Sequence, residues 1–189
     1  SDNVALGNCA MVATTTGCRN IAVGSGAMDT NTTGDKNVAI GHTTLFNATT
    51  ADDNTGVGYG ALSATTTGAI NTAIGGGSLT TNTTGTENTA VGTNSLCSNT
   101  TGNSNVAIGC GSLDANTTAS QNTAMGYESL GVNTTGCKNV AVGANSLVAN
   151  TTGFCNVAIG IVALCKNVDG HSNVAVGKNA LCNFTSGAG

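Results

Sequence analysis

The sequence repeats itself with a period of 17 residues from Asn3 to its last residue, without insertion or deletion. Each repeat opens with Asn-x-Ala-aliphatic-Gly, in which Gly56 is the one replacement of the alanine. The repeats begin at Asn3, Asn20, Asn37, Asn54, Asn71, Asn88, Asn105, Asn122, Asn139, Asn156 and Asn173. So short and strict a period predicts one supersecondary unit stacked on itself, and hence a single domain over residues 3–189.

The content of the repeat favours strands over helices. A pair of helices needs about 33 residues, and Gly, Thr and Asn are too frequent for a single helix. Numbered from its Asn, each repeat has a β-branched segment at positions 1–4, closed by Gly, and an Asn-Thr-Thr-like segment at positions 12–14, closed by Gly except at Ala51 and Ala119. We therefore predict two short strands per repeat, and an all-β parallel β-solenoid of eleven 17-residue coils stacked at about 4.8 Å.

Stacking places each position of the repeat in a column. We expect apolar columns from the aliphatic residues at position 4 and from Leu or Met at position 9, and a ladder of side-chain amides from the Asn at position 1. The Gly at positions 5 and 15 suit corners that need a positive φ or a close approach.

The strand at positions 1–5 is restricted on both faces, since positions 2 and 4 face one way and positions 1, 3 and 5 the other. One interpretation is a strand covered on both sides, by the solenoid interior and by a neighbouring chain. The other is that only Ala and Gly fit a narrow coil.

Composition argues against several classes of function. The net charge of −4, with five basic residues, disfavours binding to nucleic acid and binding to an anionic membrane surface through a polybasic segment. No apolar run approaches the roughly 20 residues of a membrane span. We also expect no enzyme and no cofactor, because there is no phosphate-binding Gly motif, and His42 and His171 fall at variable positions on distant coils.

Metal binding is not expected either. The chain lacks Cys-x-x-Cys, which argues against zinc. Asp35 and Asp52 stack at position 16 with Asp53 beside them, but Lys36 stacks against Asp53, so a solvated turn is expected there.

The repeat Asn-Thr-Thr-Gly-x-x-Asn-Thr/Val-Ala-Ile/Val-Gly-x-x-Ser/Ala-Leu resembles those of trimeric autotransporter adhesin heads, and more closely the 17-residue repeats of tail-fibre-like and surface-fibre proteins. Residues 105–112 match part of the adhesin-head motif Asn-x-Val-Ala-Ile-Gly-x-x-Ser, and residues 156–163 match it with Ala in place of Ser. The resemblance implies a left-handed parallel β-roll, often trimeric, that serves as a fibre shaft or adhesive head. The chain departs from the adhesin heads in its longer repeat, its eight cysteines and its lack of a coiled-coil stalk or anchor.

The eight cysteines, with the sequons below, predict an oxidising, extracellular setting. Cys165 and Cys182 share position 10 of successive coils, at a distance of about 5 Å that a disulfide tolerates. Cys137 and Cys155 lie one coil and one column apart, also within reach. Cys97 and Cys110 are weaker candidates that could bridge only around a corner, and Cys9 and Cys18 are left unpaired.

Asn-x-Thr sequons recur near position 12 and predict glycosylation in a host that glycosylates. The candidates are Asn31, Asn47, Asn82, Asn99, Asn116, Asn133, Asn150 and Asn183. A stacked Asn and Thr ladder explains the same residues structurally. The Thr-rich column also motivates an ice-binding alternative, although adjacent Thr at positions 13 and 14 should point to opposite faces.

We therefore expect a structural, non-enzymatic segment of an extracellular fibre. Its expected partners are copies of itself, side by side or end to end, and possible cell-surface glycans or proteins. Neither end shows an atypical capping repeat, which motivates end-to-end stacking or origin in a longer array, with Cys9 and Cys182 near the joint. Ice binding and a carbohydrate-binding tail-fibre head are the alternatives.

Overall fold

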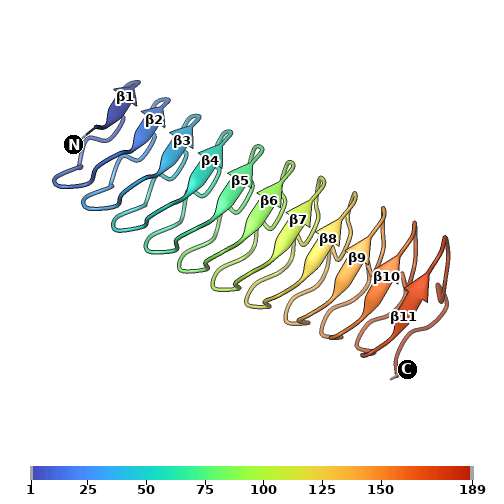
Figure 1. Ribbon diagram of the computed structural model, residues 1–189. Helices are drawn as coiled ribbons and strands as arrows, with labels where there is room; N and C mark the ends of the chain where they lie inside the picture. The colour runs from blue at the N-terminus through green and yellow to red at the C-terminus, as the bar shows by residue number, and fades with distance from the viewer. Residues whose placement is uncertain (1, 188–189) are drawn as a thin grey trace.

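The structure is a computed structural model that describes residues 2–187, and it is an all-β parallel solenoid (Figure 1). Each repeat contributes one three-residue strand to a single parallel sheet, in sequence order from β1 to β11. The prediction of a parallel β-solenoid is confirmed; residues 188 and 189 of the predicted domain lie outside the described residues. The strands are β1 (Val4–Leu6), β2 (Ile21–Val23), β3 (Val38–Ile40), β4 (Thr55–Val57), β5 (Thr72–Ile74), β6 (Thr89–Val91), β7 (Val106–Ile108), β8 (Thr123–Met125), β9 (Val140–Val142), β10 (Val157–Ile159) and β11 (Val174–Val176).

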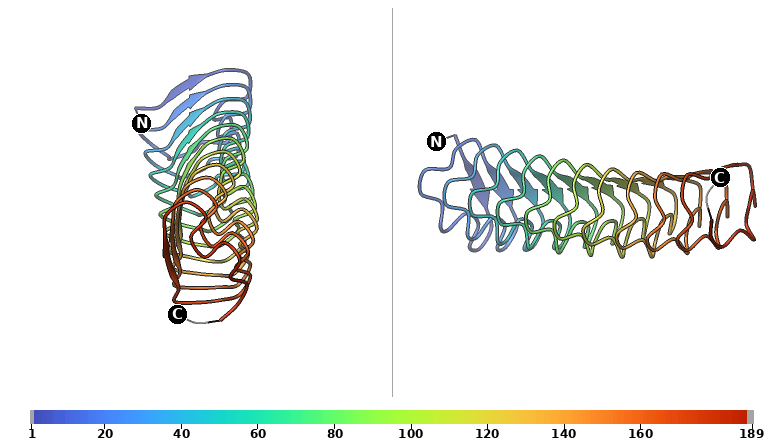
Figure 2. Two further views of the ribbon diagram at one scale, coloured as in Figure 1. Left: turned by 90° about the vertical axis from the view of Figure 1, so that its right-hand side faces the viewer. Right: turned by 90° about the horizontal axis from the view of Figure 1, so that it is seen from below.

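The coils form a rod with the two termini at opposite ends (Figure 2). Neighbouring strands pair in strict register, so that Ala90 of β6 lies beside Ala107 of β7, 17 residues later. Because the register equals the period, equivalent residues stack in columns along the rod. Within residues 2–187 the fold has no helix with the length and apolarity needed to cross a bilayer.

The predicted second strand of each coil is wrong. The Asn-Thr-Thr segments form turns and bends instead. In coil 2 the backbone N–H groups of Thr32 and Thr33 both donate to the carbonyl of Thr49, at 2.9 and 3.2 Å. Two donors that share one acceptor cannot build the regularly spaced ladder of a parallel strand pair. The segment is therefore held to the next coil without being a strand.

The interior is filled from positions 3 and 9. The Ala of each strand from β2 to β10 is fully buried, except where Gly56 replaces it, and the residues at position 9 from Met28 to Leu164 are fully buried beside them. These position-9 residues adopt the left-handed conformation, with φ of 49° at Leu164 and 52° at Met28. That backbone costs roughly 1–2 kcal/mol per residue, and full burial of a Leu side chain offsets it. The expected apolar column at position 9 is therefore internal, whereas that at position 4 lies outside.

The two glycine positions serve different needs. At position 5 the backbone has a positive φ, 133° at Gly92, where a Cβ would also lie 2.7 Å from the carbonyl oxygen of Gly109. At position 15 the reason is close approach: a Cβ on Gly85 would lie 2.6 Å from the oxygen of Gly102. Two coils nevertheless accommodate a Cβ here, at Ala51 and Ala119. Both expectations for these corners are confirmed.

Two ladders of buried Asn side chains run along the interior. At position 1, Asn105 donates its Nδ2 to Oδ1 of Asn88 at 3.1 Å and to the carbonyl of Ala119 at 2.9 Å. At position 12, Asn99 donates to Oδ1 of Asn82 at 2.8 Å. The first ladder continues through every coil from Asn20 to Asn173, and the second through every coil from Asn82 to Asn167. Every amide points the same way, with its Nδ2 toward the coil before it.

Candidate functional site

The outer face of the sheet is apolar along the whole rod. It consists of positions 2 and 4, and we call it the apolar face. Position 2 holds only Val, Ile or Thr and position 4 only Leu, Val, Ile or Met, with no charged residue in either column. All of these residues are exposed or half-buried: Ile108, near the middle of the rod, keeps 36% of its surface and Ile159 41%. Positions 2 and 4 therefore face outward, where a neighbouring chain could cover them, and the Ala at position 3 faces the narrow interior.

Two aromatic stacks, in the columns of positions 6 and 16, were missed in the sequence analysis. His42 and Tyr59 occupy position 6 of successive coils, with ring centroids 5.6 Å apart and planes 6° apart. Phe154 and His171 stack at position 16, with centroids 4.6 Å apart. The signal that could have revealed them is the recurrence of aromatic or imidazole side chains 17 residues apart. Tyr59 is 70% exposed, so the first stack offers an open ring face beside the apolar face.

The exposed threonines form one unbroken file. Position 14 is an exposed Thr in nine consecutive coils: Thr16, Thr33, Thr50, Thr67, Thr84, Thr101, Thr118, Thr135 and Thr152. The neighbouring Thr at position 13 is mostly half-buried, and its hydroxyl is used within the rod. Thr83 Oγ1, for example, donates to the carbonyl of Thr100 at 3.0 Å. The file is therefore a single column of free hydroxyls rather than a two-dimensional array.

Six of the eight predicted glycosylation sites have no room for a glycan. Asn31, Asn82, Asn99, Asn116, Asn133 and Asn150 are fully buried. In each, the Nδ2 that would carry the sugar donates instead to a backbone carbonyl inside the coil, as Asn82 does to Gly85 at 3.0 Å. The structural explanation of this column is the better one. Asn47 and Asn183 are exposed, so glycosylation stays a prediction for these two.

All eight cysteines are free thiols, so the predicted disulfides stay predictions. Cys165 Sγ lies 3.4 Å from the carbonyl of Cys182 on the next coil. Cys137 accepts a backbone hydrogen bond from the N–H of Cys155 at 3.0 Å. Cys97 Sγ donates a hydrogen bond to Asp114 Oδ1 at 2.7 Å, rather than meeting the thiol of Cys110. Burial, followed by this hydrogen bond, raises the pKa of Cys97 to about 11.

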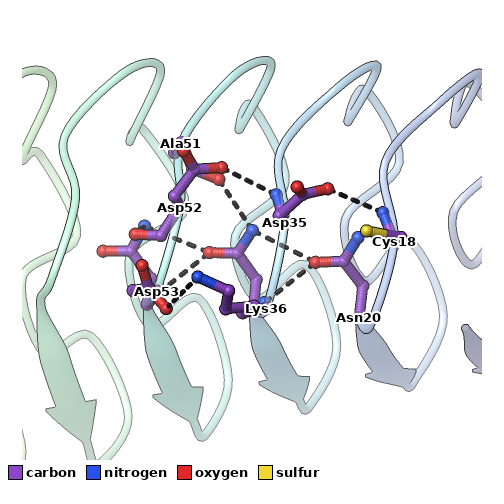
Figure 3. A network of polar contacts seen from close by, with 9 residues as sticks. Cys18, Asn20, Asp35, Lys36, Ala51, Asp52 and Asp53 are labelled. Atoms are coloured by element: carbon purple, nitrogen blue, oxygen red, sulfur yellow. Dashed lines mark hydrogen bonds and ion pairs between the residues drawn. The ribbon is translucent and has the colours of Figure 1, made fainter. Parts of the chain in front are cut away.

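Cys18 also lies beside a carboxylate, that of Asp35 on the next coil. Asp35 Oδ1 accepts from the backbone N–H of Cys18 at 2.8 Å, and Asp52 Oδ1 accepts from that of Asp35 at 2.7 Å (Figure 3). Hydrogen bonding to Cys18 lowers the pKa of Asp35, and the same carboxylate raises the pKa of the Cys18 thiol. These side chains act as caps for the neighbouring coil.

The acidic corner is neutralised as expected. Lys36 Nζ lies 3.7 Å from Asp53 Oδ1, with both side chains about half exposed (Figure 3). Among residues 2–187 no three His, Cys, Asp or Glu side chains gather as metal ligands. His42 and His171 each stack on an aromatic ring. His171 Nδ1 also lies 3.4 Å from the hydroxyl of the adjacent Ser172, on an exposed turn.

Comparison with protein-family models, with curated proteins and with solved structures finds no match for this chain. The candidate functional surfaces are therefore those that the fold itself displays: the apolar face, the position-14 Thr file and the cysteine columns. Of these, the apolar face extends over all eleven strands.

Proposed function

We propose that this chain is a structural, non-enzymatic segment of an extracellular fibre, in which copies of the chain associate side by side through the apolar face. The observation that carries the proposal is that face: two columns of aliphatic side chains and Thr, without a charge, exposed along the rod. Contiguous apolar surface of this extent on a soluble protein marks an interaction site.

The size of the apolar face fits a stable interface. Eleven strands at about 4.8 Å give a length of about 50 Å. A width of about 10 Å then gives about 500 Å² per copy and about 1,000 Å² for a pair, which is the lower limit for a specific interface. In a trimer, which the resemblance to adhesin heads implies, each copy would meet two others.

A second copy is the partner that best fits the repeat. Side chains on the apolar face recur once per coil, so a matching partner must present side chains at the same spacing over the same length. Another copy of the chain does so by construction. Absence of charge on either side also means that no buried charge is left unpaired.

The extracellular location and the adhesive role belong to the same proposal. The resemblance to surface-fibre repeats supports the location. Variable columns beside the apolar face, such as the one holding the His42 and Tyr59 stack, supply exposed ring faces of the kind that contact sugars or other proteins.

Light scattering after gel filtration tests the association. We expect the chain to elute as a defined oligomer, and a variant with Ile74→Lys and Met125→Lys to elute as a monomer, because each lysine would bury a charge in the interface. The matched control, Thr84→Lys with Thr135→Lys, adds the same charges to the same two coils on the Thr file and should remain oligomeric. A parent chain that is folded by circular dichroism but remains monomeric at high concentration would contradict the proposal.

Ice binding is the second candidate, and the position-14 Thr file is the observation that favours it. Nine hydroxyls repeat at the coil spacing without interruption. Thermal hysteresis distinguishes the two functions with the same variants: an ice-binding role predicts activity that the Thr84→Lys and Thr135→Lys pair abolishes. Absence of hysteresis in the parent chain would reject ice binding and leave the fibre proposal intact.

A further inference from the structure

Cys165 and Cys182 form an aligned pair of thiols on successive coils. The two coils are in register, since Val157 of β10 pairs with Val174 of β11. The register persists to the turn that holds the thiols, where Leu164 N–H donates to the Ala180 carbonyl at 2.9 Å. Both cysteines are half-buried, and Cys165 Sγ lies 3.4 Å from the Cys182 carbonyl, toward the second thiol's coil.

The spacing between aligned coils suits a bridging metal better than a disulfide. Equivalent Cβ atoms on coils in register are separated by about the coil spacing of 4.8 Å. A disulfide draws its Cβ atoms to about 3.8 Å, so the coils would have to be pinched together by about 1 Å. Two metal–thiolate bonds, each about as long as the 2.3 Å of a zinc–thiolate bond, span about 4.6 Å end to end, which is close to the coil spacing.

The surroundings of this pair differ from those of Cys18 and Cys97. Cys97 donates to the carboxylate of Asp114, and the Asp35 carboxylate accepts from the backbone N–H of Cys18. Each carboxylate contributes to raising the pKa of the thiol beside it. Within the described chain, Cys165 and Cys182 show no carboxylate partner. Lys166 follows Cys165 directly, and its Nζ reaches across to Asn183 Oδ1 on the next coil at 3.0 Å.

From this geometry we propose that Cys165 and Cys182 bind a soft monovalent d10 cation, Cu(I), as a two-coordinate thiolate site. Thiolates select Cu(I) among biological cations because both partners are soft. On binding, each thiol releases its proton to solvent and each sulfur donates an electron pair to the metal. The complex carries one net negative charge, opposite in sign to the ammonium of Lys166, the residue after Cys165.

A full-length variant that keeps only this pair tests the site. Cys9, Cys18, Cys97, Cys110, Cys137 and Cys155 are replaced by Ser, a residue that the chain already carries at several of these positions, including Ser63, Ser120 and Ser104. The reduced variant is titrated anaerobically with Cu(I) against a coloured Cu(I) chelator. We expect one Cu(I) per chain, a sulfur-to-copper charge-transfer band in the ultraviolet, and two sulfur ligands by X-ray absorption.

Two controls make the result decisive. Adding Cys182→Ser to that variant should weaken Cu(I) binding at least 100-fold while the circular dichroism spectrum stays unchanged. A sister variant that keeps only Cys137 and Cys155, which lie in different columns, should also bind more weakly. The proposal is overturned if either control binds as tightly as the test variant, or if the pair oxidises in air to a disulfide without loss of thermal stability.

Discussion

The side-chain methyl of Thr44 occupies the space that a side chain on Gly56 would need. A Cβ built on Gly56 would lie 2.6 Å from Thr44 Cγ2. Thr44 is the one Thr at position 8 of the repeat, where other coils carry Ser or Ala, and Gly56 is the one residue at position 3 that is not Ala. Two departures from the repeat, on successive coils, therefore compensate each other.

Gly56→Ala should destabilise the rod by about 1–3 kcal/mol, the usual cost of overpacking a rigid interior. Combining it with Thr44→Ser should recover most of that loss, because Ser has no methyl group and Ser95 already faces Ala107 in this way elsewhere in the rod. Urea denaturation of the two single variants and the double variant measures the coupling. Additive effects would show that the two residues do not interact.

A second prediction concerns a gap in the ladder at position 12. Ala48 stands where an Asn would continue the ladder, and the buried Oδ1 of Asn31 accordingly has no hydrogen-bond partner. Ala48→Asn should raise the free energy of unfolding by about 1 kcal/mol by supplying the missing donor. Room for the amide is shown by coil 7, where Asn116 donates to the carbonyl of Ala119, the same residue type as Ala51.

The matched loss is Asn116→Ala, which removes the donor to Asn99 in the continuous part of the ladder. It should cost about 1–3 kcal/mol through the unsatisfied buried oxygen. Chemical denaturation compares the two variants. A destabilising Ala48→Asn would mean that the interior at position 48 cannot accommodate the amide that the ladder requires.

A third prediction follows from Val162, which has a φ of 62°. A β-branched side chain is unfavourable in the left-handed region, whereas Asn tolerates it. Three other coils carry Asn at this position: Asn94, Asn145 and Asn179. Val162→Asn should therefore raise stability by about 1 kcal/mol, and Asn145→Val should lower it by a similar amount. Thermal unfolding of both variants checks the opposite signs.

The Cys97 thiol should be unreactive and should make stability depend on pH. Its pKa is raised to about 11 in the folded chain. The contribution to stability is then complete below the ordinary thiol pKa and is lost as the pH rises through about 11. Alkylation at pH 8 should be roughly 100-fold slower at Cys97 than at the exposed Cys110, as mass spectrometry of modified peptides can show. Equal rates would contradict this assignment.

Glycosylation, if the producing cell performs it, should reach only two positions. Expressed in a secretory host, the folded chain should carry sugar at Asn47 and Asn183 alone, because the remaining sequon amides are buried. Intact mass before and after glycosidase treatment, with Asn47→Gln and Asn183→Gln as controls, measures this. A glycan on Asn116 in folded protein would contradict the buried ladder.

The period was enough to predict the solenoid, its register and the Asn ladder at position 1, because each follows from stacking identical units. Which side chains of the strand at positions 2–4 face the interior could not be predicted. Ile108 is as apolar as Leu113, yet Ile108 faces solvent and Leu113 is fully buried. Ile108 follows the buried Ala107 in strand β7 and so points to the opposite face. Leu113 lies outside the strand with a left-handed φ of 51°, a conformation that residue type alone does not reveal.

The sequons and cysteines show a second limit. An Asn-x-Thr sequence looks the same whether its Asn points inward or outward, so Asn47 and Asn82 could not be distinguished until one proved exposed and the other buried. Likewise, the column of Cys97 was clear from the period. Its contact with Asp114 rather than a thiol depends on rotamers, which the sequence does not contain.

The two Asn ladders have a mechanical consequence. Each coil touches only the coils on either side of it, so a pull along the rod is carried by the coil interfaces in series and the weakest one sets the breaking force. From Asn82 to Asn167 both ladders cross every interface, whereas around Ala48 and Thr65 only the position-1 ladder does. Single-molecule stretching should therefore rupture the coils N-terminal to Asn82 before those between Asn82 and Asn167. Adding coils would lengthen such a fibre without strengthening it, whereas continuing the position-12 ladder through Thr14, Ala48, Thr65 and Phe184 would strengthen it.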